Sequence, residues 1–347
     1  MRDRDSTPDD VDLLRARFHE LVDDVQPQPD ALPRLLAAAR RRRSPQRGLI
    51  TVAGATVAAT AVFLVALVVS PGKPPQDAAP VSVAPNSYVA QPRPGVIASF
   101  DVASGRQLRQ LATVAGEPKA LVADGNRVYS AVSRGPAQSI VEVAPDGTQH
   151  AVQQAVDTPS PTVLTAGGGR VAYLEKGAVT VSHGSQKHRI PVPPGTRVLE
   201  LALAGDGRLA ALTESAGGTA INLTDDTAST LAQRKPIRPV GGCAPLAITW
   251  SGANVAALSP TACRPGSPVR VATFNPDSGE QVAAGVPFDA GPGPYEGARL
   301  SADRLGRFLV SRTGSRQWLV DGGDVRPVPA PCAPDGGCAV LPATFWG

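Results

Sequence analysis

Aromatic residues and methionine are scarce in this chain, and few of its residues are charged. Of 347 residues, only 4% are aromatic, one is Met and 18% are charged. The core must therefore be built from Ala, Val and Leu, and a hydrophobic content of 42% is too high for a chain that is disordered throughout. Glycine and proline number 35 each, and so many helix breakers argue against a long helical bundle. The composition indicates a protein rich in β-strands and turns.

Motifs of common enzyme chemistry are also missing. The sequence has no GxSxG nucleophile elbow, no P-loop and no dinucleotide fingerprint after a strand. His183 and His188 lie on one expected hairpin without an acidic neighbour that would complete a metal site. Asp residues at the tips of turns are explained by turn geometry. We therefore predict no catalytic residue, no metal and no cofactor.

One cluster of arginines stands out from an otherwise even distribution of charge. The net charge is +4, and the basic residues form no patch elsewhere, so nucleic-acid binding is not predicted. The cluster consists of Arg40, Arg41, Arg42, Arg43 and Arg47. Residues 49–69, which follow it, carry no charge and would span roughly 30 Å as a helix, the thickness of a bilayer core.

This pattern predicts a single-pass plasma-membrane protein. Arginines flanking a membrane helix stay in the cytoplasm, which leaves residues 1–48 inside and exports the chain after residue 70. A cleaved signal peptide is the alternative, but 48 residues are too many for its basic region and Ser70-Pro71 is a poor cleavage context. We expect an uncleaved transmembrane helix.

The cytoplasmic arm, residues 1–48, is expected to be helical. Thr7 can cap a helix and Pro8 suits its first position. Apolar residues then recur at helical spacing and form one stripe: Val11, Leu14, Phe18, Leu21, Val22 and Val25. Short helices cannot bury such a stripe alone, so it either packs within the arm and on the membrane surface or docks a cytoplasmic protein.

The arm and its anchor also carry a resemblance. The run PQPDALPRLLAAARRRR at residues 27–43, followed by one membrane span, resembles the N-terminal arms of actinobacterial single-pass membrane proteins associated with extracytoplasmic-function sigma factors. The resemblance implies regulation of a sigma factor by the arm. The zinc motif HxxxCxxC of many anti-sigma domains is absent, because His19 has no cysteine near it.

Beyond a Pro/Ala-rich linker at residues 70–86, the sequence repeats. A strand, a glycine turn and a second strand recur around Gly125, Gly168, Gly207, Gly252 and Gly306, at steps of 43, 39, 45 and 54 residues. A second kind of hairpin alternates with the first, including one expected over residues 221–232, INLTDDTASTLA. Two hairpins per unit give four strands, which is the pattern of a β-propeller blade.

The two ends of the exported region complete one blade. Residues 343–347, ATFWG, have the character of an inner strand, whereas residues 87–111 supply three strands without one. Joining them closes the ring. The expected fold is mainly β, a six-bladed β-propeller over residues 87–347, with seven blades as the main alternative and an all-β sandwich as another. The repeat form, strand–(S/A)xDG–strand, resembles TolB-type and WD40-like propeller repeats.

All four cysteines lie beyond the predicted anchor, which indicates disulfides in an oxidising compartment. Cys243 and Cys263 flank two strands that pair around one turn, so the pairing brings them together. Cys332 and Cys338 flank the next short turn. Of the three possible connectivities, hairpin geometry favours Cys243 with Cys263 and Cys332 with Cys338.

Together these features predict a non-enzymatic protein whose exported propeller binds a protein, peptide or envelope ligand. Its arm would relay this state to a cytoplasmic partner such as a sigma factor. One alternative is an anchored propeller enzyme of the lactonase, lyase or cyclotransferase type. It is disfavoured because the loops before the inner strands carry Pro, Gly and Ala rather than titratable groups. A second alternative is an envelope-assembly scaffold.

Overall fold

The computed structural model describes residues 86–346 except 135–136, 158–161, 232–234, 239–242, 291–296, 313–315 and 332–340. Several predicted features lie outside the described residues: the helical arm with its apolar stripe and arginine cluster, the predicted transmembrane helix at 49–69, and Cys332 and Cys338. Within the described ranges, no helix is long and apolar enough to cross a membrane.

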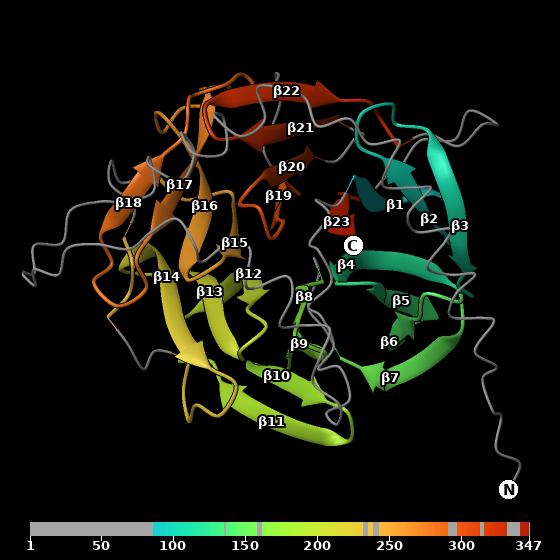
Figure 1. The fold of residues 1–347 in the computed structure, drawn as a ribbon. Helices are drawn as coiled ribbons and strands as arrows, with labels where there is room; N and C mark the ends of the chain where they lie inside the picture. The colour runs from blue at the N-terminus through green and yellow to red at the C-terminus, as the bar shows by residue number, and fades with distance from the viewer. Residues whose placement is uncertain are drawn as a thin grey trace, which may run out of the picture. The chain divides into compact units, whose positions relative to one another are not determined.

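Six antiparallel sheets form blades around a common centre (Figure 1). Each blade is given from its inner to its outer strand. The first consists of β23 (Thr344–Trp346), β1 (Ser87–Arg93), β2 (Val96–Asp101) and β3 (Gln107–Thr113), and the second of β4 (Glu117–Asp124), β5 (Arg127–Arg134), β6 (Ala137–Val143) and β7 (Gln149–Val156). The third consists of β8 (Leu164–Gly167), β9 (Arg170–Glu175), β10 (Ala178–His183) and β11 (Gln186–Pro191).

The fourth blade consists of β12 (Arg197–Leu203), β13 (Arg208–Ser215) and β14 (Gly218–Asp225). The fifth consists of β15 (Ala247–Ser251), β16 (Asn254–Pro260), β17 (Val269–Phe274) and β18 (Gln281–Ala284), and the sixth of β19 (Arg299–Ala302), β20 (Phe308–Arg312), β21 (Arg316–Asp321) and β22 (Asp324–Val328).

The five inner hairpins lie where the glycine repeat predicts them. In β4–β5 the turn follows the pair Asp124 and Arg127, and Gly125 adopts a φ of 56°, which glycine accepts readily.

The ring closes through the C-terminal strand, as the sequence predicts. β23 pairs with β1 through Val89 and Thr344, and through Tyr88 and Phe345. The Tyr88 hydroxyl donates to the Pro329 carbonyl oxygen, 3.1 Å away, just after the outer strand of the sixth blade. Contacts between neighbouring inner strands run from β23 through β4, β8, β12, β15 and β19 and back to β23. The fold is a six-bladed propeller, and the seven-bladed alternative is wrong.

The apolar core lies between blades, with one cluster for each of the six interfaces. Small and medium side chains, mainly Ala, Val and Leu, make up most of each cluster, which explains why few aromatics are needed. Some approaches are closer still: a Cβ added at Gly167 would lie 2.3 Å from the Leu203 carbonyl oxygen of the next blade. Glycine lets these two inner strands come together.

The fourth blade departs from the prediction. The outer hairpin expected over residues 221–232 is wrong in its second strand, because the chain turns away after β14. Ala228 and Leu231 are buried in the cluster between the third and fourth blades, and the Leu231 N–H donates to the Pro191 carbonyl oxygen at 3.2 Å. These residues are therefore buried against the third blade instead of pairing with the edge of β14. The chain returns at Ile237, which forms an isolated bridge with Ile221 of β14.

A disulfide joins Cys243 to Cys263, the pairing that hairpin geometry favours, with their Cα atoms 5.1 Å apart. The bond lies at the open end of the β15–β16 hairpin, where Ala247 pairs with Leu258. It fastens the segment that enters the fifth blade to the segment that leaves β16.

Candidate functional site

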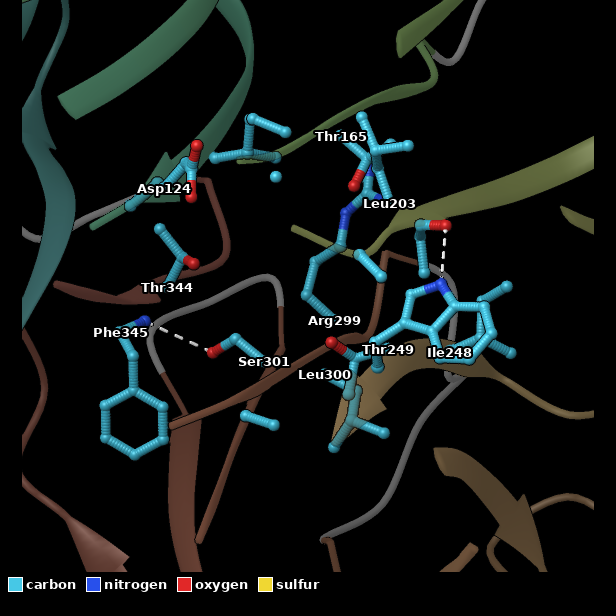
Figure 2. A pocket seen from close by; sticks show the side chains of 18 of the residues that line it. Asp124, Thr165, Leu203, Ile248, Thr249, Arg299, Leu300, Ser301, Thr344 and Phe345 are labelled. Carbon is cyan, nitrogen blue, oxygen red and sulfur yellow. Dashed lines mark hydrogen bonds between the residues drawn. The ribbon is translucent and has the colours of Figure 1, made fainter. Parts of the chain in front are cut away.

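A cavity of about 480 Å³ lies at the centre of the ring, and all six inner strands contribute to its lining (Figure 2). Much of the lining comes from residues of strands β4, β8 and β12. Polar side chains also reach it, and those labelled in Figure 2 are Asp124, Thr165, Thr249, Arg299, Ser301 and Thr344. The cavity is therefore a polar hollow inside a rigid ring of strands.

An ion pair between Glu200 and Arg299 occupies this hollow. Glu200 lies in β12 and is buried, and its Oε1 is 3.0 Å from Nη1 of Arg299, the first residue of β19. Its other oxygen, Oε2, accepts a hydrogen bond of 2.7 Å from the backbone N–H of Ile248 in β15. One carboxylate thus links inner strands of the fourth, fifth and sixth blades.

The two partners differ in exposure. The Arg299 side chain is 27% exposed, against 6% for Glu200. Figure 2 shows the Arg299 side chain extending from β19 across the cavity toward Thr165 and Leu203. Arg299 is therefore the more accessible partner of the pair.

Burial strongly affects the ionisation of Glu200. Loss of hydration raises the pKa of Glu200 from 4.5 to about 7, and the Arg299 charge and the Ile248 N–H offset only part of that rise. The carboxyl group therefore exchanges its proton close to neutral pH.

The other two carboxylates of the lining maintain the fold. Asp303 accepts hydrogen bonds from the backbone N–H groups of Leu305 and Arg307 and pairs with Arg307 Nε at 2.7 Å. Asp124 accepts a 2.6 Å hydrogen bond from the Gly169 N–H of the next blade. Both carboxylates therefore hold turns in place.

Hydroxyl groups of Thr165, Thr249, Ser301 and Thr344 also line the described part of the cavity. No histidine is among the described residues that line the cavity, and the Ser301 hydroxyl oxygen accepts the Phe345 N–H at 3.2 Å. Across the described part of the chain, no three His, Cys, Asp or Glu side chains gather as a metal site would require. A guanidinium surrounded by hydroxyl groups suits the binding of a polar anion.

The wall beside the ion pair is held by contacts between the fourth and fifth blades. Trp250 Nε1–H donates to the Ala202 carbonyl oxygen at 3.1 Å. The Arg208 guanidinium lies 4.3 Å from the centre of the Trp250 ring, and its Nη1 donates to the Ala253 carbonyl oxygen at 3.0 Å. These contacts fix the geometry of the site before any ligand arrives.

The predicted disulfide residues that the structure describes lie elsewhere, and so do the two histidines for which no metal site is predicted. Cys243 and Cys263 form the disulfide of the fifth blade and do not line the cavity. His183 and His188 belong to the outer hairpin β10–β11, where His188 Nε2 hydrogen-bonds the Ala228 carbonyl oxygen at 2.8 Å. Sequence reasoning missed Glu200 and Arg299. The available signal was a glutamate inside the apolar run VLELAL of an inner strand.

Comparison with known proteins supports the fold but gives no family. No known protein family and no curated protein matches this sequence. Among solved structures, TolB from Acinetobacter baumannii is similar, with a TM-score of 0.52 and 15% identity over 75% of this chain and 65% of that chain. The chain thus spans slightly less than two thirds of TolB, and at this identity the likeness shows the propeller fold alone.

A second structure, "YCF48 bound to D1 peptide", aligns with a TM-score of 0.37 and 13% identity over 62% of this chain and 70% of that chain. A TM-score this low does not establish a shared fold.

Proposed function

We propose that this chain is a membrane-anchored binding protein whose extracytoplasmic propeller takes a protein or peptide segment into its central cavity. The observation that supports the proposal is the polar cavity lined by all six inner strands, with an arginine that reaches into it. A preformed hollow with few, well-placed polar groups is typical of a binding site. The ring holds these groups in place, so little ordering is needed when a ligand enters.

The location and the signalling role rest on the sequence. The arginines at 40–43 and 47 and the apolar residues 49–69 favour a single span with the propeller outside. The Cys243–Cys263 disulfide agrees with an oxidising compartment. In this proposal the arm carries the state of the propeller to a cytoplasmic protein, such as a sigma factor, through its apolar stripe. An envelope-assembly scaffold would use the same propeller without that signal.

An anchored enzyme is the second candidate, and one observation favours it. A carboxyl group with a pKa of about 7 in a cavity has the proton affinity of a general acid or base. Both Glu200 oxygens are already engaged, however, one by the Ile248 N–H and the other by Arg299. Neither a histidine nor an unengaged carboxylate lies among the described lining residues to act with it. We therefore favour binding.

Site-directed crosslinking in cells tests the binding role. A photoreactive amino acid placed at Thr344, which lines the cavity, should crosslink the full chain to its ligand. The matched control is the same amino acid at Val282, which is 58% exposed on the outer strand β18. We expect a discrete adduct from position 344 and none from 282. Adducts at neither position, or equal adducts at both, would contradict a cavity-binding function.

A further inference from the structure

Arg299 has more hydrogen-bonding capacity than its partner uses. A guanidinium carries five N–H donors in a planar fork that matches the two oxygens of a carboxylate. Among the described residues, its one hydrogen bond runs from Nη1 to Oε1 of Glu200, and more than a quarter of the side chain is exposed. A second face of the fork is therefore available to a molecule in the cavity.

Glu200 is bound on both sides and is ill placed to receive a ligand itself. Its Oε2 is held by Ile248, and its Oε1 by Arg299. The inner strands beside β12 in the ring, β8 and β15, contribute no ionisable side chain. Among the described residues, Arg299 from β19 is the charged side chain paired with Glu200, while Asp124 and Asp303 are bonded to other groups and Arg304 lines the cavity beyond the end of β19.

We infer that the ligand segment presents a carboxylate to Arg299, and that this carboxylate competes with Glu200 for the guanidinium. The inference rests on the proposed function and names the chemistry that the cavity recognises. Either an acidic side chain or the free C-terminus of a peptide supplies such a group. A bidentate contact with a partly buried guanidinium provides both strength and orientation.

The competition makes binding depend on pH. When Glu200 is ionised, it neutralises Arg299 and repels a second carboxylate. When Glu200 takes up a proton, near pH 7, the positive charge of Arg299 is left without a counter-charge. Ligand affinity should therefore rise as the pH falls from 8 to 6, by about tenfold if one charge-assisted contact is gained.

Titration calorimetry on the full chain in detergent micelles tests this inference with four peptides. The acids are N-acetyl-Ala-Glu-Ala-amide, which carries the carboxylate on a side chain, and N-acetyl-tri-alanine, which carries it at the C-terminus. Their neutral counterparts are N-acetyl-Ala-Gln-Ala-amide and N-acetyl-tri-alanine amide. We expect at least one acid to bind more tightly at pH 6 than at pH 8 and its neutral counterpart to bind at least about tenfold more weakly. The acid that binds identifies the source of the carboxylate.

Variants separate the role of Arg299 in ligand binding from its role in folding. Arg299→Gln should abolish binding, and so should the double variant Glu200→Gln/Arg299→Gln, which leaves no buried charge unpaired. Glu200→Gln alone should bind at pH 8 as tightly as the natural chain does at pH 6. Arg316→Gln, an exposed arginine outside the cavity lining, is the matched control and should bind normally.

The inference fails if neither acid binds, if the neutral peptides bind equally well, or if Arg299→Gln retains binding. An adduct from position 344 together with any of these results would leave the proposed function standing and overturn the carboxylate assignment alone. Absence of both the adduct and binding would overturn both.

Discussion

At the scale of single residues, Glu200 is a costly choice for an inner strand. A carboxylate removed from water loses its hydration, and one arginine with one backbone N–H replaces only part of it. The residues on either side of Glu200 in β12 are leucines, so the carboxylate interrupts an apolar run. The cost is consistent with the role in binding that we propose for the pair.

Replacing Glu200 with Gln should change how stability depends on pH. The pKa of Glu200 is about 7 in the folded chain and near 4.5 when unfolded, so the folded state favours the proton. This contribution to stability is complete below pH 4.5 and is lost as the pH rises through 7, by about 3 kcal/mol at most. We expect the melting temperature of the natural chain to fall between pH 5.5 and 8, and that of Glu200→Gln to stay flatter.

The same measurement has an internal control. Hydrogen bonds from Ser104 lower the pKa of Asp101, and its contribution to stability is therefore lost only as the medium becomes strongly acidic. Asp101 should not influence the window above pH 5.5. Parallel melting curves for Glu200→Gln and the natural chain across that window would contradict the raised pKa.

The ion pair also shows where reading the sequence residue by residue stops. Glu200 and Arg299 are 99 positions apart, and each is next to apolar residues in its own strand. Their meeting depends on the relative positions of the fourth and sixth blades around the ring. A charge within an apolar strand could have marked Glu200 as unusual, but nothing local identifies Arg299 as its partner.

At the scale of strands and hairpins, the sequence was informative because the local chemistry and the fold agree. Gly125 and Gly252 take the positive φ that a tight turn requires, and the strands before them are rich in apolar residues. The wrong element, the outer hairpin of the fourth blade, fails for a tertiary reason. Leu231 and Ala228 have an alternative place between two blades, which a local pattern does not reveal.

β23 is the element on which ring closure depends, and Phe345 should be its most sensitive position. This side chain is buried in a cluster shared with Tyr88 of β1 and Leu309 of β20. Phe345→Ala should lower the free energy of unfolding by about 3–5 kcal/mol, because a cavity would remain between the first and sixth blades. Guanidinium unfolding followed by tryptophan fluorescence measures the loss.

Val282→Ala is the control for that experiment. Val282 is mostly exposed on the outer strand β18, so its truncation should cost less than about 0.5 kcal/mol. Equal destabilisation by the two variants would show that β23 does not secure the ring.

At the scale of the whole molecule, blade counting was reliable because a ring has to close. The sequence pattern gives five inner hairpins for six outer segments, so one blade lacks its inner strand until residues 344–346 pair with residues 87–89. This pairing is present. The central cavity follows from the same geometry, since six inner strands of small and medium residues surround it. What lines the cavity, in contrast, is set by individual side chains that point inward, and the repeat pattern does not encode their chemistry.

Orientation across the membrane is the prediction that concerns the entire chain. If the arginines at 40–43 and 47 hold the arm in the cytoplasm, the propeller matures outside and Cys243 and Cys263 become oxidised. Replacing all five arginines with Ser should raise the fraction of chains with the propeller inside, where thiols stay reduced. Alkylation of unreduced cell samples, read as a gel shift, measures that fraction through the cysteines, all of which follow residue 242. An unchanged thiol state in the substituted chain would mean that these arginines do not set the topology, and the proposed location of the propeller would lose its main support.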